Sequence, residues 1–160
     1  MIARILPLFL SASLTLPVSF VAPKGWVAKT PPSNGPVDFI WLSPHFGVSG
    51  NGENISLTTR QVPAAETLDA EVRTAIDEVS RDRTIVNSHS ESTCHGLQKG
   101  WTFDARLATP SGKTVSQIYH LAIVDGRAYS LIFTHLAGHH IPQAITDSIQ
   151  SICPNHKRAS

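Results

Sequence analysis

Residues 117–135, QIYHLAIVDGRAYSLIFTH, constrain the fold of this chain more than any other stretch. Two apolar segments flank Asp125-Gly126, a dipeptide that favours a two-residue hairpin turn with positive φ angles. Such a turn pairs Val124 with Arg127 and Ile118 with Phe133, and it leaves apolar side chains on both faces of the hairpin. A hairpin that is apolar on both faces is predicted to lie in the centre of a sheet that is covered on both sides.

A helix is predicted over residues 68–81, because apolar residues recur there with helical spacing. The acidic residues of the segment fall on the other surface, where charges usually serve solvation. Arg81 would lie near the end of this helix, where its charge complements the helix dipole. The predicted buried stripe consists of Leu68, Val72, Ala75, Ile76 and Val79, and the acidic surface carries Asp69, Glu71, Asp77 and Glu78.

A second helix is predicted from Ile141-Pro142 until Pro154 stops it. Ile145 and Ile149 should be almost fully buried, whereas Gln143 and Gln150 lie off the apolar stripe. Segments 37–44, 55–62, 84–93 and the stretch from Trp101 onward favour strands. The fold class predicted is α+β, a mainly antiparallel sheet covered by two helices in an α/β/α sandwich. The predicted apolar stripe consists of Ile141, Ala144, Ile145, Ser148, Ile149 and Ile152.

The first 19 residues have the pattern of an export signal. Arg4 precedes an apolar segment, residues 5–16, and small residues follow, with cleavage expected near Ser13 or Ser19. The sequence therefore predicts a signal peptide over 1–19, one domain over 20–154, a disordered tail over 155–160, and a secreted or periplasmic protein with no stable membrane anchor after cleavage. An uncleaved anchor is the alternative, although Ser, Thr and Pro interrupt this barely spanning segment.

Cys94 and Cys153 are the only cysteines, and an even count in an exported chain predicts a disulfide. The alternative is a reactive Cys94 beside His95. A nucleophile needs a base within reach, and neighbouring residues on an extended chain point to opposite faces. The disulfide is therefore the favoured interpretation.

Composition excludes one class of function. A net charge of +1 with both signs dispersed does not provide the basic stripe that a nucleic-acid binder needs. No phosphate-binding loop or dinucleotide fingerprint is present. The run Phe46-Gly47-Val48-Ser49-Gly50 is one residue short of a G-x-S-x-G hydrolase elbow, so a secreted hydrolase with an unrecognised site remains only an alternative.

Histidines suggest a further alternative, a metal-binding protein. His135, His139 and His140 lie within six residues, but zinc needs three or four converging ligands, and Asp147 lies too far into the next helix. We therefore expect no metal, no cofactor and no catalytic residue. Of the three tryptophans, Trp41 and Trp101 are expected to pack in strands, whereas Trp26, beside a glycine turn, is the best candidate for a partner surface.

This layout resembles the PsbP-like fold, which is named for an extrinsic protein of the oxygen-evolving complex and is shared with a Ran-binding nuclear import factor and many small exported bacterial proteins. The resemblance covers residues 18–154. It rests on Pro23-x-Gly25-Trp26, Asn54-Ile55-Ser56-Leu57, the helix over 68–79, Gly100-Trp101, the strand over 129–134 and the helix over 144–153.

The resemblance implies a non-enzymatic binding or assembly module that acts through an unknown protein or envelope partner. No functional residue of the photosynthetic or nuclear-transport proteins can be placed on this chain. The resemblance implies kinship with the exported bacterial proteins of unknown function.

Overall fold

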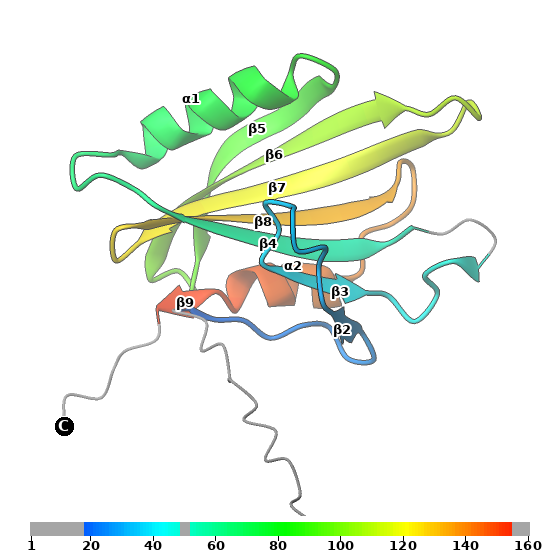
Figure 1. Ribbon diagram of the computed structural model, residues 1–160, viewed down its shortest axis with the longest axis horizontal. Coiled ribbons are helices and arrows are strands. Elements are labelled where there is room, and N and C mark those ends of the chain that lie inside the picture. The colour runs from blue at the N-terminus through cyan, green and yellow to red at the C-terminus, as the bar shows by residue number, and fades with distance from the viewer. Residues whose placement is uncertain (1–17, 49–51, 155–160) are drawn as a thin grey trace, which may run out of the picture.

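The computed structural model describes residues 18–48 and 52–154 of the 160-residue chain. The predicted tail, 155–160, and the first 17 residues lie outside the described part. The described part contains nine strands and two helices (Figure 1): β1 Val18–Ser19, β2 Val27–Lys29, β3 Phe39–Leu42, β4 Asn54–Gln61, α1 Leu68–Val79, β5 Thr84–Thr93, β6 Gln98–Ala108, β7 Thr114–Val124, β8 Arg127–Leu136, α2 Gln143–Gln150 and β9 Cys153–Pro154.

Seven strands form one antiparallel sheet in the order β2-β3-β4-β8-β7-β6-β5. The predicted hairpin is β7–β8, at the centre of this order, and its register pairs Val124 with Arg127 and Ile118 with Phe133 as expected. Asp125 and Gly126 have φ angles of 49° and 73°, the left-handed values that this turn requires. Both the position and the register of the hairpin are therefore confirmed.

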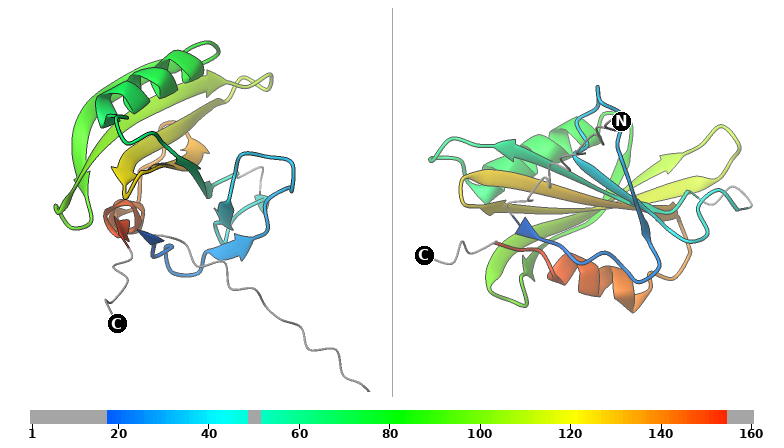
Figure 2. Two further views of the ribbon diagram at one scale, coloured as in Figure 1. Left: turned by 60° about the vertical axis from the view of Figure 1, so that its left-hand side comes forward. Right: turned by 60° about the horizontal axis from the view of Figure 1, so that its bottom comes forward.

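The two helices lie on opposite faces of the sheet (Figure 2). On the α1 face, Val72 packs with Phe103, Tyr119 and Leu121. On the α2 face, Ile145 and Ile149, 2% and 7% exposed, pack with Leu131 and other strand residues. The predicted α/β/α sandwich is confirmed. Ala144, which was expected on the buried stripe, is exposed.

Both helices are shorter than predicted. The helix α1 ends at Val79 with Ser80 as its C-cap, so its last turn carries no basic residue and Arg81 lies beyond it. Thr67 caps its N-terminus by accepting a hydrogen bond from the amide of Ala70. The helix α2 begins at Gln143, because Pro142 has extended backbone angles and serves as the N-cap.

The predicted boundary between signal and domain, after residue 19, stays a prediction, and the last two residues assigned to the signal lie in a strand. Val18 and Ser19 form β1, which pairs with β9 in a separate two-stranded sheet. Val18 is 1% exposed and belongs to the core beneath α2. Cleavage after Ser19 would remove this strand, whereas cleavage at Ser13 would leave it intact. The folded domain therefore starts no later than Val18.

Candidate functional site

Cys94 and Cys153 form a disulfide, with their Cα atoms 4.7 Å apart. The bridge joins the turn between β5 and β6 to the residue that starts β9. The prediction of a disulfide is confirmed, but the premise of an extended chain at this point was wrong. Cys94, His95 and Gly96 all have positive φ angles, between 52° and 87°, so this turn is left-handed.

The β5–β6 turn also caps the C-terminus of α2. The hydroxyl of Thr93 shares its one proton between the carbonyls of Ile149 and Ile152, at 2.8 and 3.2 Å, and the amide of His95 donates to the carbonyl of Gln150 at 3.2 Å. These bonds satisfy carbonyls that a helix end leaves without partners. The side chain of Gln150, which was predicted to lie off the apolar stripe, donates to the carbonyl of Ser92 at 2.7 Å.

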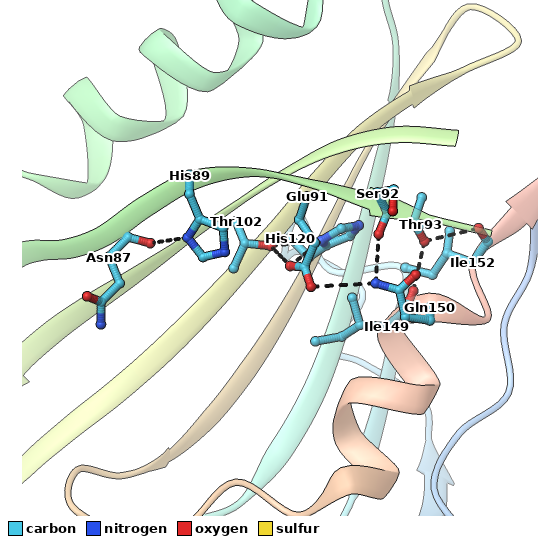
Figure 3. Close-up of polar contacts among 10 residues, drawn as sticks. All are labelled: Asn87, His89, Glu91, Ser92, Thr93, Thr102, His120, Ile149, Gln150 and Ile152. Carbon is cyan, nitrogen blue, oxygen red and sulfur yellow. Dashed lines mark hydrogen bonds and ion pairs between the residues drawn. The ribbon is translucent and has the colours of Figure 1, made fainter. Parts of the chain in front are cut away.

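A hydroxyl, an imidazole and a carboxylate converge next to this turn (Figure 3). The hydroxyl Oγ1 of Thr102 lies 2.5 Å from Oε2 of Glu91 and 3.0 Å from Nδ1 of His120. A threonine hydroxyl has one proton, and the short bond gives that proton to the carboxylate. Nδ1 of His120 must therefore carry the hydrogen that it donates to Thr102, and Nε2 is left as an acceptor.

The environment of His120 keeps the imidazole neutral. His120 is 1% exposed, and burial lowers its pKa from 6.5 to about 4, against the opposing effect of the Glu91 carboxylate. Its Nε2 is buried without a hydrogen-bond partner in the described part of the chain. The ring lies against Gly100, where an added Cβ would be 2.9 Å from Cε1 of His120. Glycine is thus the residue that lets the ring approach the β6 backbone.

This cluster does not have the arrangement of a catalytic triad. In a triad the imidazole accepts the proton of the nucleophile with one nitrogen and donates to the carboxylate with the other. Here Thr102 donates directly to Glu91, and His120 donates to Thr102. Thr102 itself is buried, with an exposed fraction of 8%. The geometry fits a hydrogen-bonded link between β5, β6, β7 and, through Gln150, α2.

The three histidines of the metal alternative line one pocket of about 400 Å³. His135 is buried and stacks on Phe133 with ring centroids 4.9 Å apart, and burial lowers its pKa. In the same pocket Ser116 donates to Asp104, which also pairs with Arg106 at 3.4 Å. Within residues 18–48 and 52–154, no group of three or more His, Cys, Asp or Glu could hold a metal ion.

Trp26, the candidate for a partner surface, is half-buried. It lines a hollow of about 270 Å³, and its ring lies 6.2 Å from that of Phe133. The other two tryptophans pack in the sheet as expected. Trp41 lies between Phe20 and Phe39, and the indole nitrogen of Trp101 donates to Ser88. Whether Trp26 contacts a partner remains a prediction.

The largest hollow that we describe is a groove of about 640 Å³ beside α1, which sequence reasoning missed. Its walls are α1 on one side and β4, β8 and β7 on the other, and its accessible surface is mainly apolar. It lies beside α1 because α1 packs mainly on β6 and β7 (Figure 2). Its lining includes Pro36, Thr58, Thr59, Arg60, Glu71, Thr74, Ala75, Glu78, Val79, Tyr119, Leu121, Ser130 and Ile132.

Charges in the groove are largely paired. The carboxylate of Glu71 forms an ion pair with the guanidinium of Arg60, and Glu71 is 9% exposed, so its predicted place on the solvated surface was wrong. Burial raises the pKa of the Tyr119 hydroxyl, against an opposing effect of Arg83, so this group stays protonated at neutral pH.

Comparison with known proteins places the fold. No family model matches the sequence, and no curated protein matches it. The solution structure of cyanobacterial PsbP (CyanoP) from Synechocystis sp. PCC 6803 is similar, with a TM-score of 0.59, 17% identity and coverage of 86% of each chain. LpqN, described as involved in cell envelope biogenesis of Mycobacterium tuberculosis, is also similar, with a TM-score of 0.58, 13% identity and coverage of 86% of this chain and 83% of its own.

A crystal structure from Bacteroides thetaiotaomicron has a TM-score of 0.60 and 13% identity. The match covers 88% of this chain but only 46% of that protein, so the two differ in overall extent. At such low identities these likenesses concern the fold alone. With its antiparallel sheet between two helices, the chain has a PsbP-like fold.

Proposed function

We propose that this protein is a non-catalytic binding module of the cell envelope, and that it holds a small, mainly apolar ligand in the groove beside α1. The groove is the observation that carries the proposal. Its volume, about 640 Å³, lies within the range of small-ligand pockets, and a few polar groups among apolar walls are typical of such sites.

The absence of an activated group in the groove supports a binding role over catalysis. No histidine is among the groove's lining residues. The carboxylate of Glu71 is held by Arg60, and the raised pKa of Tyr119 keeps its hydroxyl protonated. Ser130 and Thr74 offer hydroxyls that could orient a ligand by hydrogen bonds.

Two observations support a place outside the cytoplasm. Disulfides such as Cys94–Cys153 persist in oxidising compartments and are rare where thiols are kept reduced. The similar protein LpqN is described as involved in cell envelope biogenesis. No helix among residues 18–48 and 52–154 is long and apolar enough to cross a membrane. Intact mass of the protein recovered from its native host would show whether a segment before Val18 has been removed.

The groove is tested with an uncharged, environment-sensitive dye, Nile red. Ala75 lines the groove and is half-buried, whereas Arg73 is exposed on the same helix. Ala75→Phe should fill the groove and weaken dye binding by at least roughly tenfold, while Arg73→Phe should bind as the wild type does. Circular dichroism confirms that each variant is folded. If Ala75→Phe disrupts folding, Ser130→Leu fills the groove from the opposite wall. Undiminished binding by a folded, filled variant would refute the proposal.

A further inference from the structure

The groove beside α1 is elongated, because one of its walls is a single stripe of that helix. The lining residues on α1 recur with the spacing i, i+3, i+4, i+7 and i+8, so they share one face of the helix. With a rise of about 1.5 Å per residue, this wall extends about 12 Å along the helix axis. A groove of this form fits a linear chain. The stripe consists of Glu71, Thr74, Ala75, Glu78 and Val79.

One end of the groove carries most of its polar groups. Arg60 of β4 forms an ion pair with Glu71 in the first turn of α1. Two residues before Arg60, Thr58 pairs with Ser130 of β8 in the register of the sheet, and both line the groove. The hydroxyl of Thr58 donates its proton to the carbonyl of Ser130 at 3.3 Å. The hydroxyl of Ser130 has no hydrogen-bond partner within the described residues, so its proton is available to a ligand.

The other end of the groove is mainly apolar. Ile132, the next residue of β8 on the α1 face, pairs with Tyr119 of β7. Both pack in the cluster that includes Val79, the last residue of α1. Arg83, just beyond α1, acts on the hydroxyl of Tyr119, but its guanidinium is paired with Asp82 at 2.9 Å. An aliphatic chain fits this end, with its polar group directed toward Ser130.

The lining offers no unpaired positive charge to an anionic ligand. It has three charged residues, and one positive and two negative charges give it a net charge of −1. Arg60 and Glu71 neutralise each other, and the exposed Glu78 forms no ion pair within the described part of the chain. A carboxylate would therefore lose hydration beside acidic side chains without gaining a free cation. An ammonium group is also disfavoured at the polar end, because Glu71 already has its cation.

We infer that the groove binds a linear aliphatic chain whose polar end is an uncharged ester, an inference that rests on the function proposed above. The carbonyl of the ester accepts the free proton of Ser130, and the chain lies along Ala75 toward Ile132 and Val79. Both oxygens of an ester are acceptors only. An alcohol or a primary amide would bring a donor of its own, and a donor that is buried without a partner costs free energy.

Competition for Nile red by three compounds that share an eight-carbon chain tests the charge of the polar end. The compounds are methyl octanoate, octanoate and octylamine, and the protein is the full chain at neutral pH. Methyl octanoate should displace the dye at concentrations at least roughly tenfold lower than either charged compound. Displacement by octanoate at the same or a lower concentration would overturn the inference, while dye binding that Ala75→Phe abolishes would leave the proposed function standing.

The contact with Ser130 is tested by carbon-13 NMR of methyl octanoate labelled at its carbonyl, a measurement that needs no dye. Ser130→Ala should weaken binding of the ester about fivefold and move the bound carbonyl resonance upfield, because the carbonyl loses a hydrogen bond. Ser90→Ala is the matched control, since Ser90 is an exposed residue of β5, at the far edge of the sheet, and it should bind as the wild type does.

The outcomes separate the inference from the function on which it rests. If the ester binds equally well to wild type and to a folded Ser130→Ala, with an unchanged carbonyl resonance, the inference is wrong although the groove binds ligands. If wild type binds neither Nile red nor the labelled ester, both proposals fail. If a thermal melt shows that Ser130→Ala is unfolded, the ranking of the three compounds on the wild type decides without any variant.

Discussion

Acidification should destabilise this protein in part through His120, the histidine whose pKa is lowered to about 4. The imidazole is buried and neutral in the fold, with a pKa near 4, whereas an unfolded chain has a histidine pKa of 6.5. Between pH 6.5 and about pH 4, His120 therefore binds a proton in the unfolded state but not in the folded state. The contribution of His120 is fully present above pH 6.5 and is lost progressively as the pH falls toward 4.

The size of the effect follows from the two pKa values. Each unit of difference corresponds to about 1.4 kcal/mol, so His120 alone should lower the free energy of unfolding by at most about 3 kcal/mol across this interval. That is a large fraction of the roughly 5–15 kcal/mol by which a domain of this size is usually stable. Glu91 limits the loss, because its carboxylate lies 3.9 Å from Nδ1 of His120 and favours the protonated ring.

Urea unfolding followed by tryptophan fluorescence, repeated at several pH values, measures the effect. His120→Gln cannot titrate, so the difference between wild type and this variant should be constant above pH 6.5 and should shrink by about 3 kcal/mol by pH 4. His89→Gln is the control, because His89 is exposed and bonded only to the carbonyl of Asn87. Parallel pH curves for wild type and His120→Gln would show that the imidazole is not held neutral.

Three further changes test the packing. Ile149→Ala should lower the free energy of unfolding by about 2–5 kcal/mol in a thermal melt or urea titration. Gln143→Ala, which loses one exposed hydrogen bond within α2, should stay within about 0.5 kcal/mol of the wild type. If Ile149→Ala melts like the wild type, α2 does not cover the core. Gly100→Ala should lower the free energy of unfolding by about 1–3 kcal/mol in the same assay, because its Cβ would lie 3.0 Å or less from the buried ring of His120 and the backbone carbonyl of Glu91. An unchanged melting temperature would show that these neighbours can move. Replacing both Cys94 and Cys153 by alanine should lower the free energy of unfolding, measured in urea, by up to about 4 kcal/mol. Thiol titration of the unfolded wild type should find no free thiol at these two cysteines, and two free thiols per chain would refute the disulfide.

Much of the fold could be predicted because local patterns and tertiary packing agree. The Asp125-Gly126 turn fixes the register of β7–β8, and that register decides which side chains face each helix. The helical stripes of α1 and α2 then supply the cover for those faces. The place of Val18 and Ser19 in a strand could not be predicted, because their partner β9 lies at the other end of the sequence and no local pattern indicates the pairing.

The candidate sites were harder to foresee for the same reason. The groove depends on how far α1 extends across the sheet, which no single segment specifies. Glu71 reads as a solvated helix residue until Arg60, on a different element, is placed beside it. His120 follows the apolar alternation of β7, and only the register with Thr102 and the position of Glu91 reveal the polar cluster around it. The cysteine pair was predictable because it depends on number and compartment rather than on geometry.

The pairing of β1 with β9 has a consequence for the order of folding. Val18 and Ser19 are joined to Pro154 and Cys153, so the first strand of the domain has its partner at the opposite end of the sequence. A chain that emerges from its N-terminus offers the central hairpin and both helices before that partner exists, and contacts of such long sequence separation form at a high entropic cost. A ribosome or translocation channel that still holds residues 153–154 therefore keeps the N-terminal strand unpaired and the apolar side chain of Val18 in water.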